Sequence, residues 1–205
     1  MIFLLVNSTF HSLQSWDYQT FHLINEIWTN RFLDLIFPWI REKFIWIPFY
    51  LCLVYIWIKE YRWRGFLLLL GLILSVIISD LLSAHLIKIY FHRLRPCQDL
   101  NTIKHVILRI ECGTGYSFVS SHASNHFTVA AFTALWFRFR KPILEPLIYL
   151  WAGIISYAQI YVGLHYPLDV MGGALLGLLI GWSLGYLCIR RLSLKSVKTL
   201  DYPLI

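Results

Sequence analysis

The chain alternates between long uncharged stretches and short basic segments. Five stretches contain no Lys, Arg, Asp or Glu: residues 44–58, 65–79, 113–137, 146–168 and 170–189. A helix of roughly 20 apolar residues crosses the hydrocarbon core of a bilayer, and some of these stretches need polar neighbours to reach that length. The pattern predicts an all-α, polytopic helical bundle with five transmembrane helices, in one integral membrane domain that covers residues 1–205.

Residues 1–43 carry a different pattern. Trp16, Phe21, Ile24 and Trp28 recur at near-helical spacing, with polar residues between them. Such an amphipathic helix is typical of a segment that lies in the membrane interface, although the same region could supply a sixth span. The absence of Lys and Arg before Arg31 argues against a cleavable signal peptide.

Composition and charge support the membrane setting. Of the 205 residues, 58% are hydrophobic and 14% are charged, whereas a soluble domain carries about a quarter charged residues. The net charge of +7 alone would suit a nucleic-acid-binding protein. Most of the 18 Lys and Arg residues, however, fall in three clusters at alternate ends of the predicted spans: 59–64, 138–141 and 190–198.

These three clusters can all lie on one side of the membrane. The positive-inside bias assigns that side to the cytoplasm, with residues 190–205 as a basic cytoplasmic tail. We therefore expect a protein of the bacterial inner membrane, with no nucleic-acid partner. The motifs described below lie at the opposite ends of the spans, which would face the periplasm.

The four cysteines divide into two kinds. Cys52 and Cys188 lie inside apolar stretches, where a small buried hydrophobic residue is the simplest interpretation. Cys97 and Cys112 lie together in a segment predicted to be external. A disulfide is permitted there, and closing a loop of about 15 residues would contribute about 3 kcal/mol. Two free thiols are the alternative.

Lys88 and Arg95 are the cations that the charge pattern leaves unexplained. Lys88 closes a predicted span, and Arg95 follows before Pro96, which disfavours helix. A lysine point charge and a planar guanidinium together suit phosphate oxygens. Snorkelling toward lipid headgroups explains either residue equally well when it is taken alone.

Ser120, Ser121 and His122 precede a mostly apolar helical run. A serine N-cap leaves backbone N–H groups that favour an anion, and His122 in the first turn could donate a proton to a leaving oxygen. A capped helix with a structural histidine is the alternative. His126, four residues on, makes a metal pair conceivable, but no carboxylate or thiolate is placed to complete it, so we expect no metal or other cofactor.

His165 and Asp169 are four residues apart and share a face if a helix has begun. Pro167 between them is tolerated in a first helical turn. An aspartate that accepts from one ring nitrogen leaves the other nitrogen unprotonated, which makes the histidine a nucleophile. A His and an Asp at this spacing are common by chance, but here they follow the two previous motifs.

Taken in this order, the three motifs resemble the signatures of the type-2 phosphatidic acid phosphatase superfamily, which includes bacterial acid phosphatases and vanadium haloperoxidases. The resemblance runs from about residue 80 to 173 and includes the sequences around Ser120 and His165. It implies that His165 attacks phosphorus, that Asp169 orients it and that His122 protonates the leaving group. It further implies a phosphoryl site formed by Lys88, Arg95, Ser120, Ser121 and backbone amides, without a metal.

The chain departs from the family pattern in three places. Val119 and Ser121 stand where the family has proline and glycine. Gln159 stands where the family has an arginine, six residues before His165, and we expect it to bind the substrate in place of that arginine. Gln donates hydrogen bonds but carries no charge, and loss of one such donor typically costs ~10²–10³ in rate. Arg93 is a candidate to replace the missing charge.

Asp80 lies inside a predicted span, so it must face protein or water. It is about 12 Å from Lys88 along an α-helix. We interpret it as a structural partner of a polar group.

Three functions are compatible with these residues. The first is a phosphatase that acts on a lipid phosphate or diphosphate at the outer face. The second is a lipid-phosphate-binding relative weakened or silenced by Gln159, and the third is a haloperoxidase. The short chain and compact outer loop resemble small bacterial enzymes that hydrolyse undecaprenyl diphosphate. Lipid A and phosphatidylglycerol phosphate are the alternative substrates.

Overall fold

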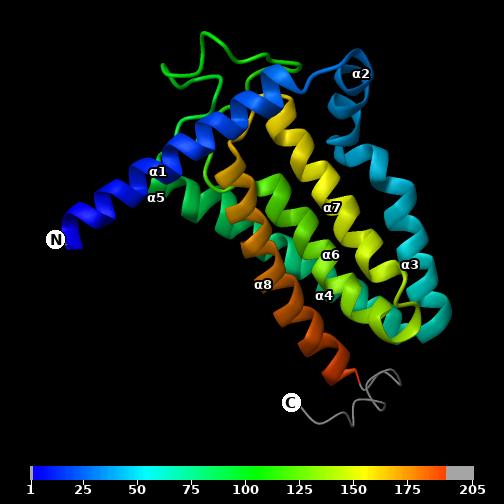
Figure 1. Ribbon diagram of the computed structural model, residues 1–205. Coiled ribbons are helices and arrows are strands. Elements are labelled where there is room, and N and C mark those ends of the chain that lie inside the picture. Colours follow the sequence, from blue (N-terminus) through cyan, green and yellow to red (C-terminus); the bar gives the residue numbers. More distant parts are fainter. Residues whose placement is uncertain (1, 193–205) are drawn as a thin grey trace.

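The computed structural model describes residues 2–192, and every regular element in that range is helical (Figure 1). This confirms the all-α prediction. In chain order the elements are α1 (Ile2–His22), η1 (Leu23–Ile27), α2 (Arg31–Ile40), η2 (Lys43–Trp46), α3 (Ile47–Tyr61), α4 (Trp63–Asp80), η3 (Leu81–Ile87), α5 (Lys88–Phe91), α6 (Ser121–Arg140), α7 (Leu144–Tyr161) and α8 (Pro167–Arg191).

Three helical segments within residues 2–192 are long and apolar enough to cross a bilayer: Lys43–Tyr61, Trp63–Phe91 and Pro167–Arg191. The second is continuous, because α4, the π-helical turn η3 and α5 follow one another without a break. Helices α6 and α7 pack among these segments (Figure 1). The number of helices that actually span the membrane, five or six, remains a prediction.

Close approach of α6 and α8 forms the centre of the bundle. Gly173, Gly177 and Gly181 recur at every fourth position of α8, on the face toward α6. A Cβ atom at Gly177 would lie 2.2 Å from the Ser124 carbonyl oxygen, and the other two positions are similarly tight. The absence of a side chain therefore lets the two backbones meet, as small residues do in membrane bundles.

The polar end of the bundle is covered by the N-terminal helices. Helix α1 and the loop 92–120 lie at the same end of the molecule (Figure 1). The Asn25 side chain donates to the carbonyls of Ile107 and Tyr161, which ties η1 to this loop and to α7. A disulfide joins Cys97 and Cys112 within the loop and confirms the bridged alternative.

The basic clusters lie at the other end of the bundle. The α3–α4 turn, the α6–α7 turn and the end of α8 share that end (Figure 1). The described parts of the basic clusters therefore lie on one side, as the positive-inside assignment requires. Lys195 and Lys198 of the third cluster lie outside the described residues. The expectation that Cys52 is buried was wrong, because Cys52 is exposed on α3. On a membrane helix, lipid rather than protein can cover such a side chain.

Candidate active site

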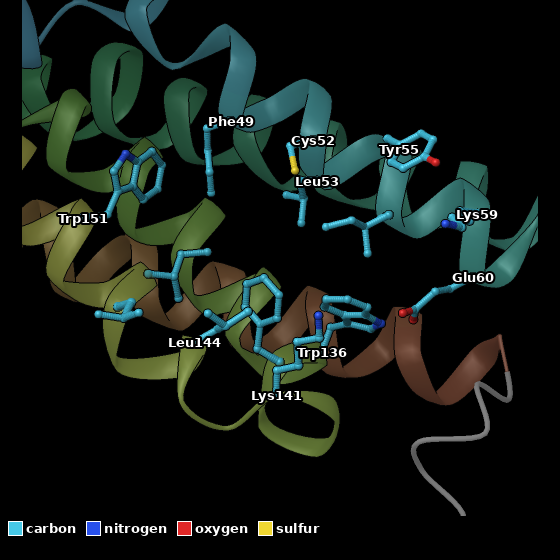
Figure 2. Close-up of a pocket in the computed structure, with 14 residues that line it drawn as sticks. Phe49, Cys52, Leu53, Tyr55, Lys59, Glu60, Trp136, Lys141, Leu144 and Trp151 are labelled. Atoms are coloured by element: carbon cyan, nitrogen blue, oxygen red, sulfur yellow. The ribbon is translucent and has the colours of Figure 1, made fainter.

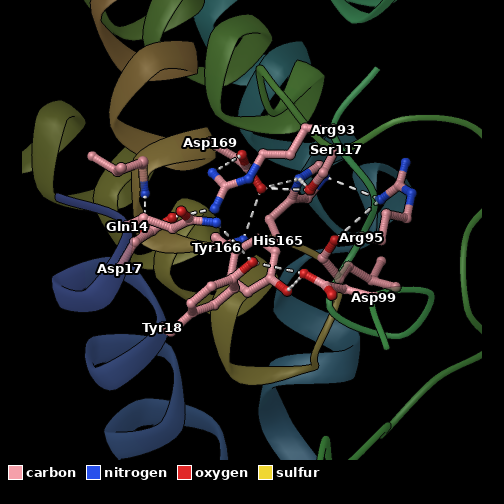
Figure 3. A network of polar contacts seen from close by, with 12 residues as sticks. Gln14, Asp17, Tyr18, Arg93, Arg95, Asp99, Ser117, His165, Tyr166 and Asp169 are labelled. Atoms are coloured by element: carbon pink, nitrogen blue, oxygen red, sulfur yellow. Dashed lines mark hydrogen bonds and ion pairs between the residues drawn. The ribbon is translucent and has the colours of Figure 1, made fainter. Parts of the chain in front are cut away.

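The three motifs converge at the polar end of the bundle. Lys88 begins α5, Arg95 lies in the following loop, His122 lies in the first turn of α6, and His165 lies in the short connection between α7 and α8. Figure 3 shows the polar network around His165, with contributions from α1, the loop and the start of α8. Residues from distant parts of the sequence are thus brought together.

His165 is buried, with 3% of its surface exposed. Its Nε2 atom lies 3.2 Å from Nη1 of Arg95, and its Nδ1 atom lies 3.2 Å from Oγ of Ser117. Because a guanidinium can only donate, Nε2 is the acceptor and the proton is on Nδ1. The ring therefore presents an unprotonated Nε2 toward the cation.

Asp169 does not bond to His165 in the way the spacing predicted. Its Oδ2 atom lies 3.6 Å from Nδ1 of His165, which is beyond ordinary hydrogen-bond length. The Ser117 hydroxyl lies between them and donates to the same Oδ2. The physical reason is that Asp169 also caps α8, since Oδ2 accepts from the backbone N–H of Tyr166 at 2.8 Å. The Ser117 hydroxyl therefore connects the aspartate to the histidine.

Arg93 holds the other oxygen of Asp169. Its Nη1 donates to Asp169 Oδ1 at 2.7 Å, and its Nη2 donates to Asp17 of α1. Asp17 is fully buried and also accepts from the backbone N–H of Leu168 at 2.8 Å. Arg93 is therefore committed to two carboxylates and does not supply the charge that Gln159 lacks. It positions Asp169 instead, and it links α1 to the site.

Arg95 is held by backbone carbonyls. Its guanidinium donates to Gly115, Thr114 and Leu164 at 3.2–3.3 Å, and 8% of the residue is exposed. Burial lowers the pKa of Arg95 from its ordinary value. Lys88 lies close enough to Arg95 and Asp169 to interact electrostatically with both.

The start of α6 has the predicted cap. Ser120 is the N-cap residue, and its side chain accepts from the backbone N–H of Ala123 at 3.4 Å. The Ser120 N–H donates to the Asp169 carbonyl at 2.9 Å, which joins the starts of α6 and α8. His122 lies within electrostatic range of His165 and Lys88. The predicted proton donor and nucleophile therefore belong to one site.

Gln159 lies near the end of α7, next to the connection that carries His165. Its carbonyl oxygen accepts from the backbone N–H groups of Leu164 and His165 at 3.1 and 3.2 Å. Its side chain is fully buried, and neither amide atom has a hydrogen-bond partner among residues 2–192. Gln159 thus shapes the connection that carries His165.

Arg41 is a further cation near the site, beyond Lys88 and Arg95, and the sequence patterns did not indicate it. It caps the C-terminus of α2, and 14% of its side chain is exposed. It pairs with Glu42 at 2.9 Å, while its buried Nε has no partner within the described residues. It lies within electrostatic range of both His122 and Arg95. No sequence motif relates residue 41 to residue 165, so the proximity of Arg41 to the site is apparent only from the fold.

Burial controls the protonation of His165. Desolvation lowers the pKa of His165 to about 4, assisted by the nearby cations Arg95 and Lys88 and opposed by Asp169. The ring is therefore neutral at physiological pH. A neutral imidazole with an unprotonated Nε2 is the nucleophilic form.

A cavity of about 660 Å³ lies away from this chemistry, between α3, the end of α6 and α7 (Figure 2). Phe49, Trp136 and Trp151 line it, with Lys59 and Lys141 toward the basic end of the bundle. It contains none of the predicted site residues. The predicted catalytic residues therefore lie outside this cavity.

The chain is similar to proteins of known family and activity. The model of the PAP2 superfamily matches residues 64–193. A lipid A 4'-phosphatase of Bacteroides thetaiotaomicron is 34% identical over 175 residues, which is 84% of this chain and 76% of that protein. An undecaprenyl-diphosphatase of Sulfolobus acidocaldarius is 26% identical over 191 residues, 91% of this chain and 83% of that protein.

A solved structure shares the fold. It is a transmembrane PAP2-type phosphatidylglycerolphosphate phosphatase from Bacillus subtilis, with a TM-score of 0.66 and 22% identity. The similarity covers 92% of this chain and 93% of that one.

Proposed function

The chain belongs to the PAP2 superfamily and is a membrane lipid phosphatase, and we propose that it acts through a phosphohistidine on His165. One observation carries this proposal: the buried His165 presents an unprotonated Nε2 toward Arg95 while Ser117 and Asp169 back its Nδ1. A nucleophile with a cation in front and a carboxylate relay behind suits attack on a phosphoryl group.

The reaction has two steps. In the first, Nε2 attacks phosphorus and the bond to the leaving oxygen breaks, while His122 gives that oxygen its proton. The positive charge that develops on the imidazole is stabilised through Ser117 by Asp169. In the second, His122 takes a proton from water, the resulting oxygen attacks phosphorus, and the P–N bond breaks to restore His165 and release phosphate. Lys88, Arg95, Ser120 and Ser121 hold the phosphoryl oxygens.

Arg41 supplies the charge that Gln159 lacks. A phosphoryl group beside His122 and Arg95 would lie within the field of Arg41, which enters the site from α2 rather than from α7. The buried Nε of Arg41 has no partner among the described residues and is available to an anion. The chain is then an active phosphatase whose third cation has moved to another element, rather than a silenced relative.

The substrate we favour is a phosphate monoester of the lipid A type. The relative named as a lipid A 4'-phosphatase is 34% identical, against 26% for the one named as an undecaprenyl-diphosphatase. This reverses the order expected from chain length and loop size alone. Undecaprenyl diphosphate remains the second candidate, because both lipids present a phosphate on a hydrophobic anchor.

We place the enzyme in the bacterial inner membrane with its site toward the periplasm. The support is the separation of the basic clusters from the site, at opposite ends of the bundle (Figure 1), together with the positive-inside bias. The disulfide between Cys97 and Cys112 lies at the site end, and an oxidising compartment permits it. We propose that residues 1–43 lie along that membrane surface.

Phosphate release by the purified protein in detergent tests the proposal. The panel contains a lipid A-type monophosphate, undecaprenyl diphosphate and phosphatidylglycerol phosphate, with chelator present and His165→Ala as the control. We expect release that survives chelator, is fastest with the lipid A-type substrate and is absent in the variant. Release that is unchanged in His165→Ala would refute the assignment of the nucleophile.

A further inference from the structure

A second cavity, of about 590 Å³, lies between α3, α4 and α6 and reaches His122. Leu, Ile and Val side chains of α3 and α4 form much of its apolar wall. Ile73 and Ile77 in this wall are 46% and 49% exposed, so the cavity lies against the lipid-facing surface of α4. An apolar cavity that begins beside the phosphate site suits an acyl chain of the substrate.

The end of this cavity nearest the site is polar. Asp80, Ser121, Asn125 and His126 line it there. Three buried atoms have no hydrogen-bond partner within residues 2–192: Oγ of Ser121, Oδ1 of Asn125 and Nε2 of His126. Buried polar atoms are normally paired, so three orphans around one cavity point to a ligand that pairs them.

The hydrogen bonds that Asn125 and His126 already make determine whether their unpaired atoms can donate or accept. Nδ2 of Asn125 donates to Oδ1 of Asp80 at 2.9 Å, which leaves the Asn125 oxygen open as an acceptor. Nδ1 of His126 lies 2.8 Å from the His122 carbonyl and must donate to it, so Nε2 of a neutral His126 is also an acceptor. A carboxylate such as that of Asp80 has no proton to donate and can only accept hydrogen bonds. The group of Asp80, Asn125 and His126, here called the acceptor cluster, therefore needs a hydrogen-bond donor.

The depth of the cluster indicates which part of a lipid would meet it. Asn125 and His126 follow His122 by three and four residues, which is about 4.5–6 Å further along the helix. This is the distance of a few bonds from the phosphorylated headgroup. The ligand group therefore lies near the attachment of an acyl chain, rather than in its tail.

We propose that the acceptor cluster binds a hydroxyl or amide N–H group on an acyl chain of the substrate, close to the phosphorylated headgroup. This inference rests on the proposed lipid phosphatase function and narrows its substrate class. An ester-linked chain offers only carbonyl acceptors, and a polyprenyl chain offers no polar group at this depth. Amide-linked and hydroxylated acyl chains on a phosphorylated sugar satisfy the cluster.

The test compares three synthetic glucosamine phosphate lipids of equal chain length. One carries an N-linked 3-hydroxyacyl chain, one an N-linked plain acyl chain and one an O-linked plain acyl chain. We expect wild-type kcat/KM to be about 2- to 12-fold higher for a lipid that satisfies the cluster than for the ester lipid, the range expected for one neutral hydrogen bond. The two N-linked lipids separate the contribution of the hydroxyl from that of the amide.

Asn125→Leu and His126→Phe should each reduce this preference toward one. Thr133→Val is the matched control, because Thr133 is also on α6 with a buried hydroxyl that lacks a partner among the described residues, yet it does not line the cavity. The control should keep the wild-type preference. If a cluster variant does not fold, the comparison of the three lipids on the wild-type protein still decides the question.

Two results would overturn the inference, and they differ. Release from all three lipids with equal wild-type kcat/KM would overturn the acceptor cluster and leave the phosphatase function intact. No release from any of the three would overturn the proposed function, and the inference with it.

Discussion

Replacement of Ser117 with alanine should lower kcat and leave KM nearly unchanged. The Ser117 hydroxyl lies 3.2 Å from Nδ1 of His165 and donates to Oδ2 of Asp169. Alanine removes this bridge, and the two remaining groups are 3.6 Å apart. The positive charge on the imidazole develops only as Nε2 attacks, so the lost interaction affects the transition state more than substrate binding.

The expected loss follows from the kind of bond that is removed. A hydrogen bond to a charged group contributes about 1.5–3 kcal/mol, and each 1.36 kcal/mol of barrier changes a rate tenfold. The kcat of Ser117→Ala should therefore fall about 10- to 150-fold. A fall of this size is smaller than the loss expected for His165→Ala, which removes the nucleophile itself.

Steady-state phosphate release in detergent measures this effect. Ser117→Thr keeps a hydroxyl and should recover much of the rate. Ser79→Ala is the matched control, since Ser79 is a fully buried serine whose hydroxyl lies 2.7 Å from that of Ser124, outside the candidate site. A wild-type kcat in Ser117→Ala would show that Asp169 acts on His165 without the serine, and the relay would have to be abandoned.

Three further predictions concern charge, pH and the disulfide. Arg41→Gln should lower kcat/KM by about 10²–10³-fold, and addition of Gln159→Arg should restore part of it; full activity in Arg41→Gln would contradict the charge assignment. Because the pKa of folded His165 is about 4 and the unfolded value is about 6.5, the unfolded chain binds more protons between these values. The contribution of His165 to the free energy of unfolding is therefore most favourable above pH 6.5 and falls as the pH is lowered toward 4. The drop in Tm over this range should be smaller for His165→Gln than for the wild type. Equal drops in the two proteins would argue against a depressed pKa of His165. Reductant should lower the Tm of the wild type but not of Cys112→Ser, because the disulfide between Cys97 and Cys112 contributes about 3 kcal/mol to the free energy of unfolding. An equal change of Tm in both proteins would contradict a stabilising disulfide.

Local patterns predicted the helices and much of the site. The uncharged stretches predicted the helical bundle, and the serine before His122 predicted the N-cap of α6. Both depend on residues close in sequence. The glycines at every fourth position of α8 were not interpreted from the sequence, although their spacing could have indicated the close contact with α6.

The contacts between distant segments could not be predicted in this way. Asp17 lies on an amphipathic helix, and nothing in that pattern indicates that it meets Arg93 behind Asp169. Arg93 therefore looked like a phosphate-binding residue until the fold paired it with two carboxylates. Ser117 is three residues before Ser120 in the sequence, yet its position between His165 and Asp169 depends on the path of the whole loop.

The structural role of Asp80 as the partner of a polar group could be predicted from physical reasoning. A charge inside a span requires a polar partner, and Asn125 of α6 provides one at 2.9 Å. Which residue would pair with Asp80 depended on how α4 packs against α6. The same packing creates the acceptor cluster, which no sequence pattern indicated.

Capture of the covalent intermediate tests the central claim most directly. The purified protein is mixed with a lipid A-type substrate labelled with ³²P at its phosphate, quenched in alkali within milliseconds, digested and mapped by mass spectrometry. We expect an acid-labile, alkali-stable label on the peptide that contains His165, and no label in His165→Ala. Release of phosphate by the wild type with label on another residue, or release that persists in His165→Ala, would contradict the phosphohistidine mechanism.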